Sequence, residues 1–289
     1  MNALRGIALF LLQCLMTPVV LALMMLVLPL GGPAVYGLAR RWCQTNVLVG
    51  RLLGLRYRIE YEEAPARGTA GAGPVVILAK HSSAWETFFI VGHFPRLVPV
   101  VKRELLWVPF FGWGLALCRP ISIDRSVPRE ARAQLQEQGV ARARDGLSIM
   151  IFPEGTRIPP GHRGRYAAGG AGLAMAAGIP VVALAHDAGY FWRKSLFDKR
   201  AGTIQVRISA PMLAQPGESA ADLTRRAEHW IEAQIESFGH PPAQRTPAAL
   251  AAWRGAAADA PLADAPLADA APADLSLADA PPADAPPAG

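Results

Sequence analysis

A long uncharged segment near the N-terminus limits what this chain can fold into more than any other feature. No charged side chain occurs from Gly6 to Ala39. Because a helix needs roughly 20 apolar residues to cross the hydrocarbon core of a bilayer, a membrane helix fits within about Ile7–Leu30. A cleaved secretory signal has an apolar region of only ~7–15 residues and a small-residue cleavage site, which this sequence lacks. We therefore expect residues 1–40 to be a retained anchor, either one transmembrane helix or a hairpin within one leaflet.

Basic residues follow this segment and predict how the anchor is oriented. Arg5 precedes it, whereas Arg40, Arg41, Arg51, Arg56 and Arg58 follow it. The positive-inside rule therefore places the rest of the chain in the cytoplasm. The chain carries a formal net charge of +6, and six aspartates in residues 255–289 are included in that total, so residues 1–254 carry +12. We expect an anionic membrane surface as the partner and not a nucleic acid.

Cysteine and histidine spacing predicts neither disulfides nor a metal centre. Cys14, Cys43 and Cys118 are an odd, scattered set, which is typical of a reducing compartment. The six histidines show no metal-binding spacing. We expect no metal.

Short apolar runs alternate with helical patterns between residues 56 and 238, which predicts an α/β fold. The expected strands are 56–61, Val75–Ala79, Leu97–Val101, Ile121–Asp124, Ser148–Phe152, Pro180–Ala185 and Ile204–Ser209. The expected helices are Ala84–Phe94, Leu105–Leu117, Arg129–Arg144, Tyr166–Ala177 and Ala220–Phe238. This order favours a largely parallel mixed sheet flanked by helices on both faces. Functional side chains are then expected at the carboxyl ends of the strands.

The C-terminal segment differs in composition from the rest. Residues 241–289 are rich in Ala, Pro and Asp, and Asp recurs at every fifth position from Asp259 to Asp284. Five residues is neither a helical nor a strand period, and few large apolar residues are present to offset the entropy of ordering. We expect a disordered tail at 241–289, after one folded domain at 41–240.

His81 and Glu86 form the first candidate site. His81 follows a predicted strand, and Glu86 lies five residues later. The two side chains meet only if His81 lies in the turn before the helix, since five residues on one helix are about 140° apart. Glu86 would then orient one imidazole nitrogen and leave the other free to act as a general base.

A structural alternative exists for the same residues. Ser83 and Glu86 have the spacing of a capping box, in which the glutamate binds the backbone N–H of the serine and has no effect on His81. Both interpretations stay open at this point.

The second candidate site is the sequence Phe152-Pro153-Glu154-Gly155-Thr156-Arg157, which directly follows a predicted strand. Gly155 permits a left-handed backbone and close approach of a ligand. Thr156 offers a hydroxyl, and Arg157 offers a planar guanidinium that matches phosphate oxygens. The pattern indicates a phosphate clamp, with a solvated turn as the alternative.

Two further cations follow predicted strands. Lys102 ends one strand and is a candidate for the same phosphate. Arg125 comes after Ile123 and Asp124, and an ion pair between Asp124 and Arg125 is the simpler interpretation. The apolar cluster around Trp107, Phe110 and Trp113 is a core element, a membrane-facing patch or an acyl pocket.

These blocks together resemble the glycerolipid acyltransferase family, and bacterial 1-acylglycerol-3-phosphate acyltransferases above all. The matching residues are His81 with Glu86, then Lys102–Leu105 with Pro109 and Gly112, Ile123–Arg125, Phe152–Arg157 and Ile179–Leu184. The resemblance covers about residues 75–190 and the apolar N-terminus. The family usually has Asp where this chain has Glu86, and the longer side chain still supplies a carboxylate.

The resemblance implies that His81 deprotonates the sn-2 hydroxyl of 1-acyl-sn-glycerol 3-phosphate, with Glu86 orienting its ring. The alkoxide attacks acyl-CoA or an acyl carrier protein thioester, and no other cofactor is implied. Gly155, Thr156, Arg157, Lys102 and Arg125 hold the acceptor phosphate, whereas Glu154 organises the loop. The expected location is the bacterial inner membrane, with the catalytic domain facing the cytoplasm.

Two other functions fit parts of the pattern. In the first, the chain is an acyltransferase whose acceptor is another lysolipid, such as lyso-ornithine lipid. In the second, the chain is a non-catalytic lipid-binding membrane protein.

Overall fold

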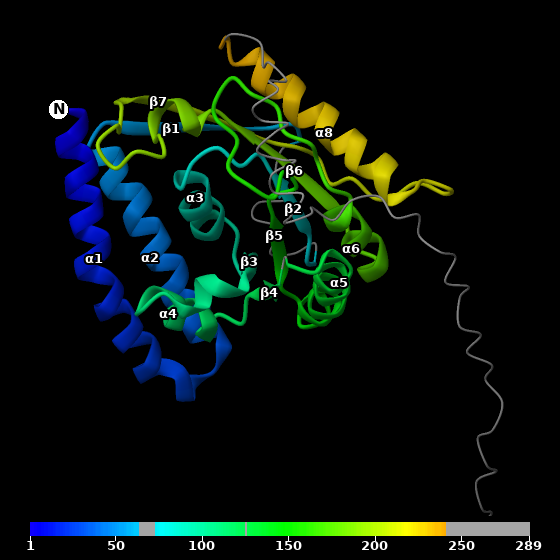
Figure 1. The fold of residues 1–289 in the computed structure, drawn as a ribbon, viewed down its shortest axis with the longest axis horizontal. Coiled ribbons are helices and arrows are strands. Elements are labelled where there is room, and N and C mark those ends of the chain that lie inside the picture. The colour runs from blue at the N-terminus through cyan, green and yellow to red at the C-terminus, as the bar shows by residue number, and fades with distance from the viewer. Residues whose placement is uncertain (64–72, 125, 241–289) are drawn as a thin grey trace, which may run out of the picture.

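The computed structural model describes residues 1–63, 73–124 and 126–240 and contains one seven-stranded sheet (Figure 1). Its strands are β1 (Leu55–Tyr61), β2 (Val76–Ala79), β3 (Leu97–Lys102), β4 (Ile121–Ile123), β5 (Ser148–Ile151), β6 (Val181–His186) and β7 (Gly202–Ile208). All seven lie within a residue or two of the predicted strands. The predicted tail at 241–289 lies outside the described residues.

The sheet is mixed and largely parallel, as predicted. The strand order is β1-β7-β6-β2-β5-β3-β4, and only the β6–β7 pair is antiparallel. The strands β6, β2, β5, β3 and β4 therefore share one direction, and their carboxyl ends lie along one edge. β2, β5 and β6 are buried along their whole length, which is typical of parallel strands covered on both faces.

Helices cover both faces of the sheet, and each face has its own core. The helices α5 (Pro128–Arg144), α6 (Gly169–Ala177) and α8 (Ala220–Ser237) pack on one face. The helices α2 (Gly32–Leu52), α3 (Trp85–His93) and α7 (Ala188–Phe191) pack on the other. Figure 1 shows the sheet between these two layers. The predictions did not include α2 and α7.

One predicted helix, Leu105–Leu117, is wrong as a continuous element. The chain instead forms a short 3-10 helix, η2 (Arg103–Trp107), and a separate helix α4 (Phe111–Leu117). Pro109 disfavours a helical conformation in the preceding residue, and Val108 is extended. Phe110 then adopts a φ of 61°, which ends any helical continuity.

The N-terminal segment folds into an antiparallel helical pair. Helix α1 (Asn2–Val27) is followed by the 3-10 turn η1 (Leu28–Leu30) and by α2, which packs beside α1 (Figure 1). Pro18 lies within α1 without ending it. The predicted end of the anchor at residue 40 lies inside α2, so the hairpin continues into the rest of the chain through one helix.

Helix α1 is attached to the rest of the protein along its length. Arg5 Nε donates to the carbonyl of Leu53 at 2.7 Å, and Gln13 Nε2 donates to Asn46 Oδ1 at 3.1 Å. Leu9 is 1% exposed and belongs to the core between the sheet and the helices α2, α3 and α7. The rest of α1 is mostly exposed, and the segment Asn2–Leu30 is long and apolar enough to cross a membrane. These features indicate membrane association by a helix that also packs on the sheet-containing part of the chain.

Candidate active site

The candidate catalytic residues lie where neighbouring parallel strands end. Lys80 and His81 follow β2, and the loop starting at Phe152 follows β5. His186 is the last residue of β6. Because β5 and β6 are the two neighbours of β2, these three segments meet at one edge of the sheet.

His81 and Glu86 form a hydrogen-bonded pair in the turn before α3. His81 Nδ1 lies 2.9 Å from Glu86 Oε1. Since a carboxylate accepts, Nδ1 carries the hydrogen and Nε2 is the nitrogen that can take a proton. The imidazole stacks on the Phe152 ring with 3.9 Å between centroids, and 16% of the side chain is exposed. This is the geometry that a general base and its orienting group require.

Glu86 also binds the turn itself, so the capping and catalytic interpretations hold together. Its Oε1 accepts from the backbone N–H groups of Ser82 at 3.1 Å and Ser83 at 2.8 Å. Helix α3 begins at Trp85 with Ala84 at the N-cap position, and the Ser83 hydroxyl accepts from Trp85 N at 3.0 Å. The alternative in which Glu86 leaves His81 without a partner does not hold in the structure.

The environment of Glu86 keeps its carboxylate charged. Burial raises its pKa, but the nearby His186, the hydrogen bond and charge of His81, and the Ser83 amide together hold the pKa below its usual value. His186 Nε2 lies 4.0 Å from Glu86 Oε2 and donates to the carbonyl of Lys80 at 2.8 Å. Sequence reasoning missed His186, although its place at the end of a buried strand is a detectable signal.

The second predicted motif forms a loop that is joined to His81. Gly155 has a φ of 68°, the left-handed conformation that glycine favours. The N–H of Ile158 donates to the carbonyl of His81 at 2.8 Å, so the loop and the base share a backbone contact. Thr156 and Arg157 are exposed and line the same cavity as His81. The base and the guanidinium therefore face one space.

Glu154 belongs to this loop, and it is almost fully buried. Its Oε2 accepts from the N–H of His81 at 2.9 Å, and its Oε1 accepts from Gly164 N at 3.3 Å. Oε1 also lies 2.7 Å from Lys80 Nζ. Glu154 thus joins the turn after β2, which carries Lys80 and His81, to the chain near Gly164. Lys80 is a second residue that sequence reasoning missed.

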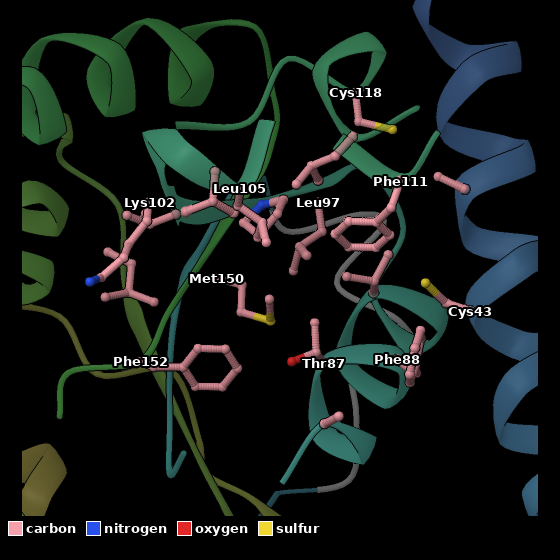
Figure 2. A pocket seen from close by; sticks show the side chains of 18 of the residues that line it. Cys43, Thr87, Phe88, Leu97, Lys102, Leu105, Phe111, Cys118, Met150 and Phe152 are labelled. Atoms are coloured by element: carbon pink, nitrogen blue, oxygen red, sulfur yellow. The ribbon is translucent and has the colours of Figure 1, made fainter. Parts of the chain in front are cut away.

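The two other predicted phosphate ligands have different outcomes. Lys102 is exposed at the end of β3 and lines the cavity, as Figure 2 shows. Arg125 lies outside the described residues. Asp124 contacts Arg103 at 3.4 Å and accepts from the hydroxyl of Ser126 at 2.6 Å. Lys194 also lines the cavity and was not predicted.

A large, mostly apolar cavity extends from His81 toward α1, α2 and α4. Its volume is about 1000 Å³. Figure 2 shows Met150 and Phe152 facing Thr87 of α3 across it. The remote walls are mostly apolar and include Leu21, Met24, Cys43, Leu105, Phe111 and Cys118.

The aromatic cluster of η2 and α4 is divided between the cavity and the surface. Phe110 and Phe111 line the cavity, whereas Trp107 is 77% exposed and Trp113 is 52% exposed. None of these side chains is buried, so the core interpretation is wrong for them, and the acyl pocket and the membrane-facing patch stay predictions. Among the described residues, no group of three or more acidic, His or Cys side chains is placed to hold a metal.

The fold and this site define an acyltransferase: a His–Glu pair and basic side chains border an apolar cavity of lipid size. The Acyltransferase family model matches residues 57–187. The 1-acyl-sn-glycerol-3-phosphate acyltransferase of Pseudomonas aeruginosa is 47% identical over 197 residues, which cover 66% of this chain and 74% of that protein. The chain belongs to the 1-acyl-sn-glycerol-3-phosphate acyltransferase family.

More distant proteins agree with this assignment. The human 1-acyl-sn-glycerol-3-phosphate acyltransferase beta is 28% identical over 188 residues, which cover 64% of this chain and 66% of that protein. The crystal structure of the 1-acyl-sn-glycerophosphate acyltransferase PlsC from Thermotoga maritima matches 82% of this chain and 96% of its own, with a TM-score of 0.66. At 17% sequence identity, that structure shows the shared fold.

Proposed function

We infer that this enzyme transfers a fatty acyl group from a thioester to the free sn-2 hydroxyl of 1-acyl-sn-glycerol 3-phosphate, giving phosphatidic acid for phospholipid biosynthesis. The observation that supports this most directly is that His81, paired with Glu86, and Arg157 line one cavity. The 47% identity to the Pseudomonas enzyme supports the same acceptor.

The reaction follows from the state of the imidazole. His81 Nε2 takes the proton of the acceptor hydroxyl as its oxygen attacks the thioester carbonyl. Glu86 stabilises the imidazolium that forms, since it is charged and fully buried. The tetrahedral intermediate then collapses, the C–S bond breaks, and the thiolate leaves with the proton from His81. The products are the ester and the free thiol of CoA or of the carrier protein, with no acyl-enzyme.

Basic residues at the cavity supply a site for the acceptor phosphate. Arg157 presents a fork of N–H donors, and Gly155 lets the loop backbone approach closely. Lys102 and Lys194 border the same space and add positive charge. We assign Arg157, Thr156, Gly155 and Lys102 to this phosphate.

The apolar part of the cavity accommodates an acyl chain. A volume of about 1000 Å³ lies at the upper end of ligand pockets, which typically measure roughly 300–1,000 Å³. Its remote walls come from the helices that carry the exposed apolar surface. A lipid chain can therefore enter it from a membrane without crossing water.

The contacts of α1 favour a hairpin attached to one leaflet over a helix that crosses the bilayer. Arg5 and Gln13 bind α2 and its C-terminal turn, so α1 lies along the catalytic part of the chain. Exposed apolar residues on α1 and the exposed Trp107 and Trp113 supply surfaces for the lipid interface. We place the protein on the cytoplasmic face of the inner membrane, where acyl-CoA and acyl carrier protein are available.

An in vitro assay tests this function. Purified protein is mixed with lysophosphatidic acid and palmitoyl-CoA, and both phosphatidic acid and free thiol are measured. We expect one thiol per ester formed. A phosphate-free acceptor, lyso-ornithine lipid, is the parallel arm, and preference for it would refute the phosphate assignment. Thiol release absent with every acceptor and with either acyl-CoA or an acyl carrier protein thioester would favour a non-catalytic lipid-binding protein.

A further inference from the structure

A buried ion cluster lies behind the His81 turn and joins three segments that are distant in the sequence. Lys80 Nζ lies 2.7 Å from Glu154 Oε1 and 2.9 Å from Glu232 Oε1. The three side chains are 5%, 0% and 3% exposed. Glu232 belongs to α8, and its Oε1 also accepts a 2.9 Å hydrogen bond from the Tyr166 hydroxyl. The cluster thus ties the end of β2, the loop after β5 and α8 at one point.

Two hydrogen bonds hold the peptide group that precedes the proposed base, and one of them comes from the cluster. Glu154 Oε2 accepts from the N–H of His81 at 2.9 Å. The carbonyl of Lys80 accepts from His186 Nε2 at 2.8 Å. The peptide group between Lys80 and His81 is therefore fixed at both its carbonyl and its N–H. A shift of the cluster would move the imidazole relative to the cavity.

The charges of the cluster indicate a role in geometry more than in stability. It contains two carboxylates for one ammonium, and Lys80 also donates to the carbonyl of His162 at 3.2 Å. Burial raises the pKa of Tyr166 well above its usual value, so the phenol stays a neutral donor. Well-packed apolar side chains usually stabilise an interior at least as well as buried ions do. What apolar side chains cannot supply is the directional hold on Lys80 and Glu154.

We propose that Glu232 is a positioning residue for acyl transfer, which acts through Lys80 and Glu154 to hold His81 and the Arg157 loop in register. Glu232 lies on α8, beyond the motifs that the sequence pattern identified, and outside the residues that line the cavity. The inference rests on the acyl-transfer reaction proposed above.

The test compares three α8 variants in the lysophosphatidic acid assay. Glu232→Ala removes both acceptors, Glu232→Gln keeps an oxygen for Lys80 and Tyr166, and Glu236→Ala is the matched control because Glu236 is exposed one turn later. A displacement of about 1 Å costs on the order of 10²-fold in rate, so we expect kcat to fall at least about tenfold in Glu232→Ala. The KM for lysophosphatidic acid should change less than about twofold, since Glu232 does not touch substrate. We expect Glu232→Gln to recover most of the lost kcat.

A second variant keeps the proposal falsifiable if Glu232→Ala fails to fold. Tyr166→Phe keeps the ring and removes only the hydroxyl that holds Glu232. We expect a fall in kcat of about two- to fivefold at an unchanged KM, in a protein that still folds but melts at a lower temperature because one buried hydrogen bond is lost. A normal kcat in a folded Glu232→Ala variant would overturn the positioning role. If Glu232→Ala does not fold, a normal kcat in Tyr166→Phe would overturn it instead. An inactive wild-type protein would instead refute the proposed function.

Discussion

Replacing Glu86 by Gln separates the charge of this side chain from its hydrogen-bonding geometry. Its Oε1 accepts from His81 Nδ1 and from the amides of Ser82 and Ser83. In the variant, the two backbone N–H groups can only be satisfied by the amide oxygen of Gln, because the amide nitrogen is a donor. The oxygen is therefore expected to stay in place and keep His81 in the tautomer with Nδ1 protonated.

The size of the effect follows from which bond changes during the reaction. The two backbone bonds are the same before and after proton transfer, whereas the bond to His81 strengthens as the imidazolium forms. A hydrogen bond to a charged group contributes roughly 1.5–3 kcal/mol, against roughly 0.5–1.5 for a neutral pair. Because the Gln oxygen keeps a hydrogen bond to His81, the transition-state loss is the difference between these values, about 1–1.5 kcal/mol, which corresponds to a fall in kcat of roughly 5- to 13-fold. A flipped amide, which would present its nitrogen to His81, would cost on the order of 10⁴-fold, as in a triad whose histidine is held in the wrong tautomer.

The assay measures free thiol release with lysophosphatidic acid and acyl-CoA for wild type, Glu86→Gln and His81→Ala. Thermal unfolding of each variant controls for loss of fold. We expect Glu86→Gln to lie well above the His81→Ala floor and well below wild type. Wild-type turnover would mean that Glu86 serves only the turn, and turnover at the floor would mean that the two serine amides do not fix the side chain.

Four further substitutions test other parts of the site. His81→Ala should abolish turnover in a protein that melts normally, since it removes the base but only a partly exposed ring; near-normal turnover would exclude His81 as the base. Arg157→Ala should raise the KM for lysophosphatidic acid at least about tenfold, because a charge-assisted bond to phosphate contributes roughly 1.5–3 kcal/mol, and an unchanged KM would move the phosphate elsewhere. Lys80→Met should destabilise the protein by about 3–5 kcal/mol in urea titration, since it leaves two buried carboxylates without a cation; an unchanged midpoint would contradict the buried cluster. Cys43→Trp should lower the preference for long over short acyl chains about tenfold, as two buried methylenes contribute roughly 1.6 kcal/mol, and equal preference would place the chain outside this cavity.

The sheet was predictable because its signal is local. Each strand is a short run of apolar residues bounded by Gly, Pro or charge, and all seven were found within a residue or two. Helix α2 was missed because it starts within the uncharged segment and ends among arginines, so its pattern changes along its length. The break between η2 and α4 depends on Pro109 and on the left-handed Phe110, which the helical spacing of the apolar residues concealed.

The site was predictable only in part, because only some of its residues lie in local sequence motifs. His81, Glu86 and Arg157 lie in short motifs, so their chemistry can be read from neighbours in the chain. Lys80 and Glu232 meet across 152 positions, and no local pattern predicts such a contact. His186 acts only because β6 lies beside β2, which depends on the order of the strands in the sheet.

The N-terminal helical pair and the cavity share the same helices, which argues against treating the N-terminus as a detachable anchor. Leu21 and Met24 of α1 and Cys43 of α2 line the cavity, while neighbouring residues of α1 are exposed to the surroundings. Leu9 of α1 belongs to the core between the sheet and the helices α2, α3 and α7. A helix that contributes to the core, the cavity wall and the exposed apolar surface is coupled to the active site by its packing. A shift of α1 would therefore change the walls of the cavity as well as the exposed apolar surface.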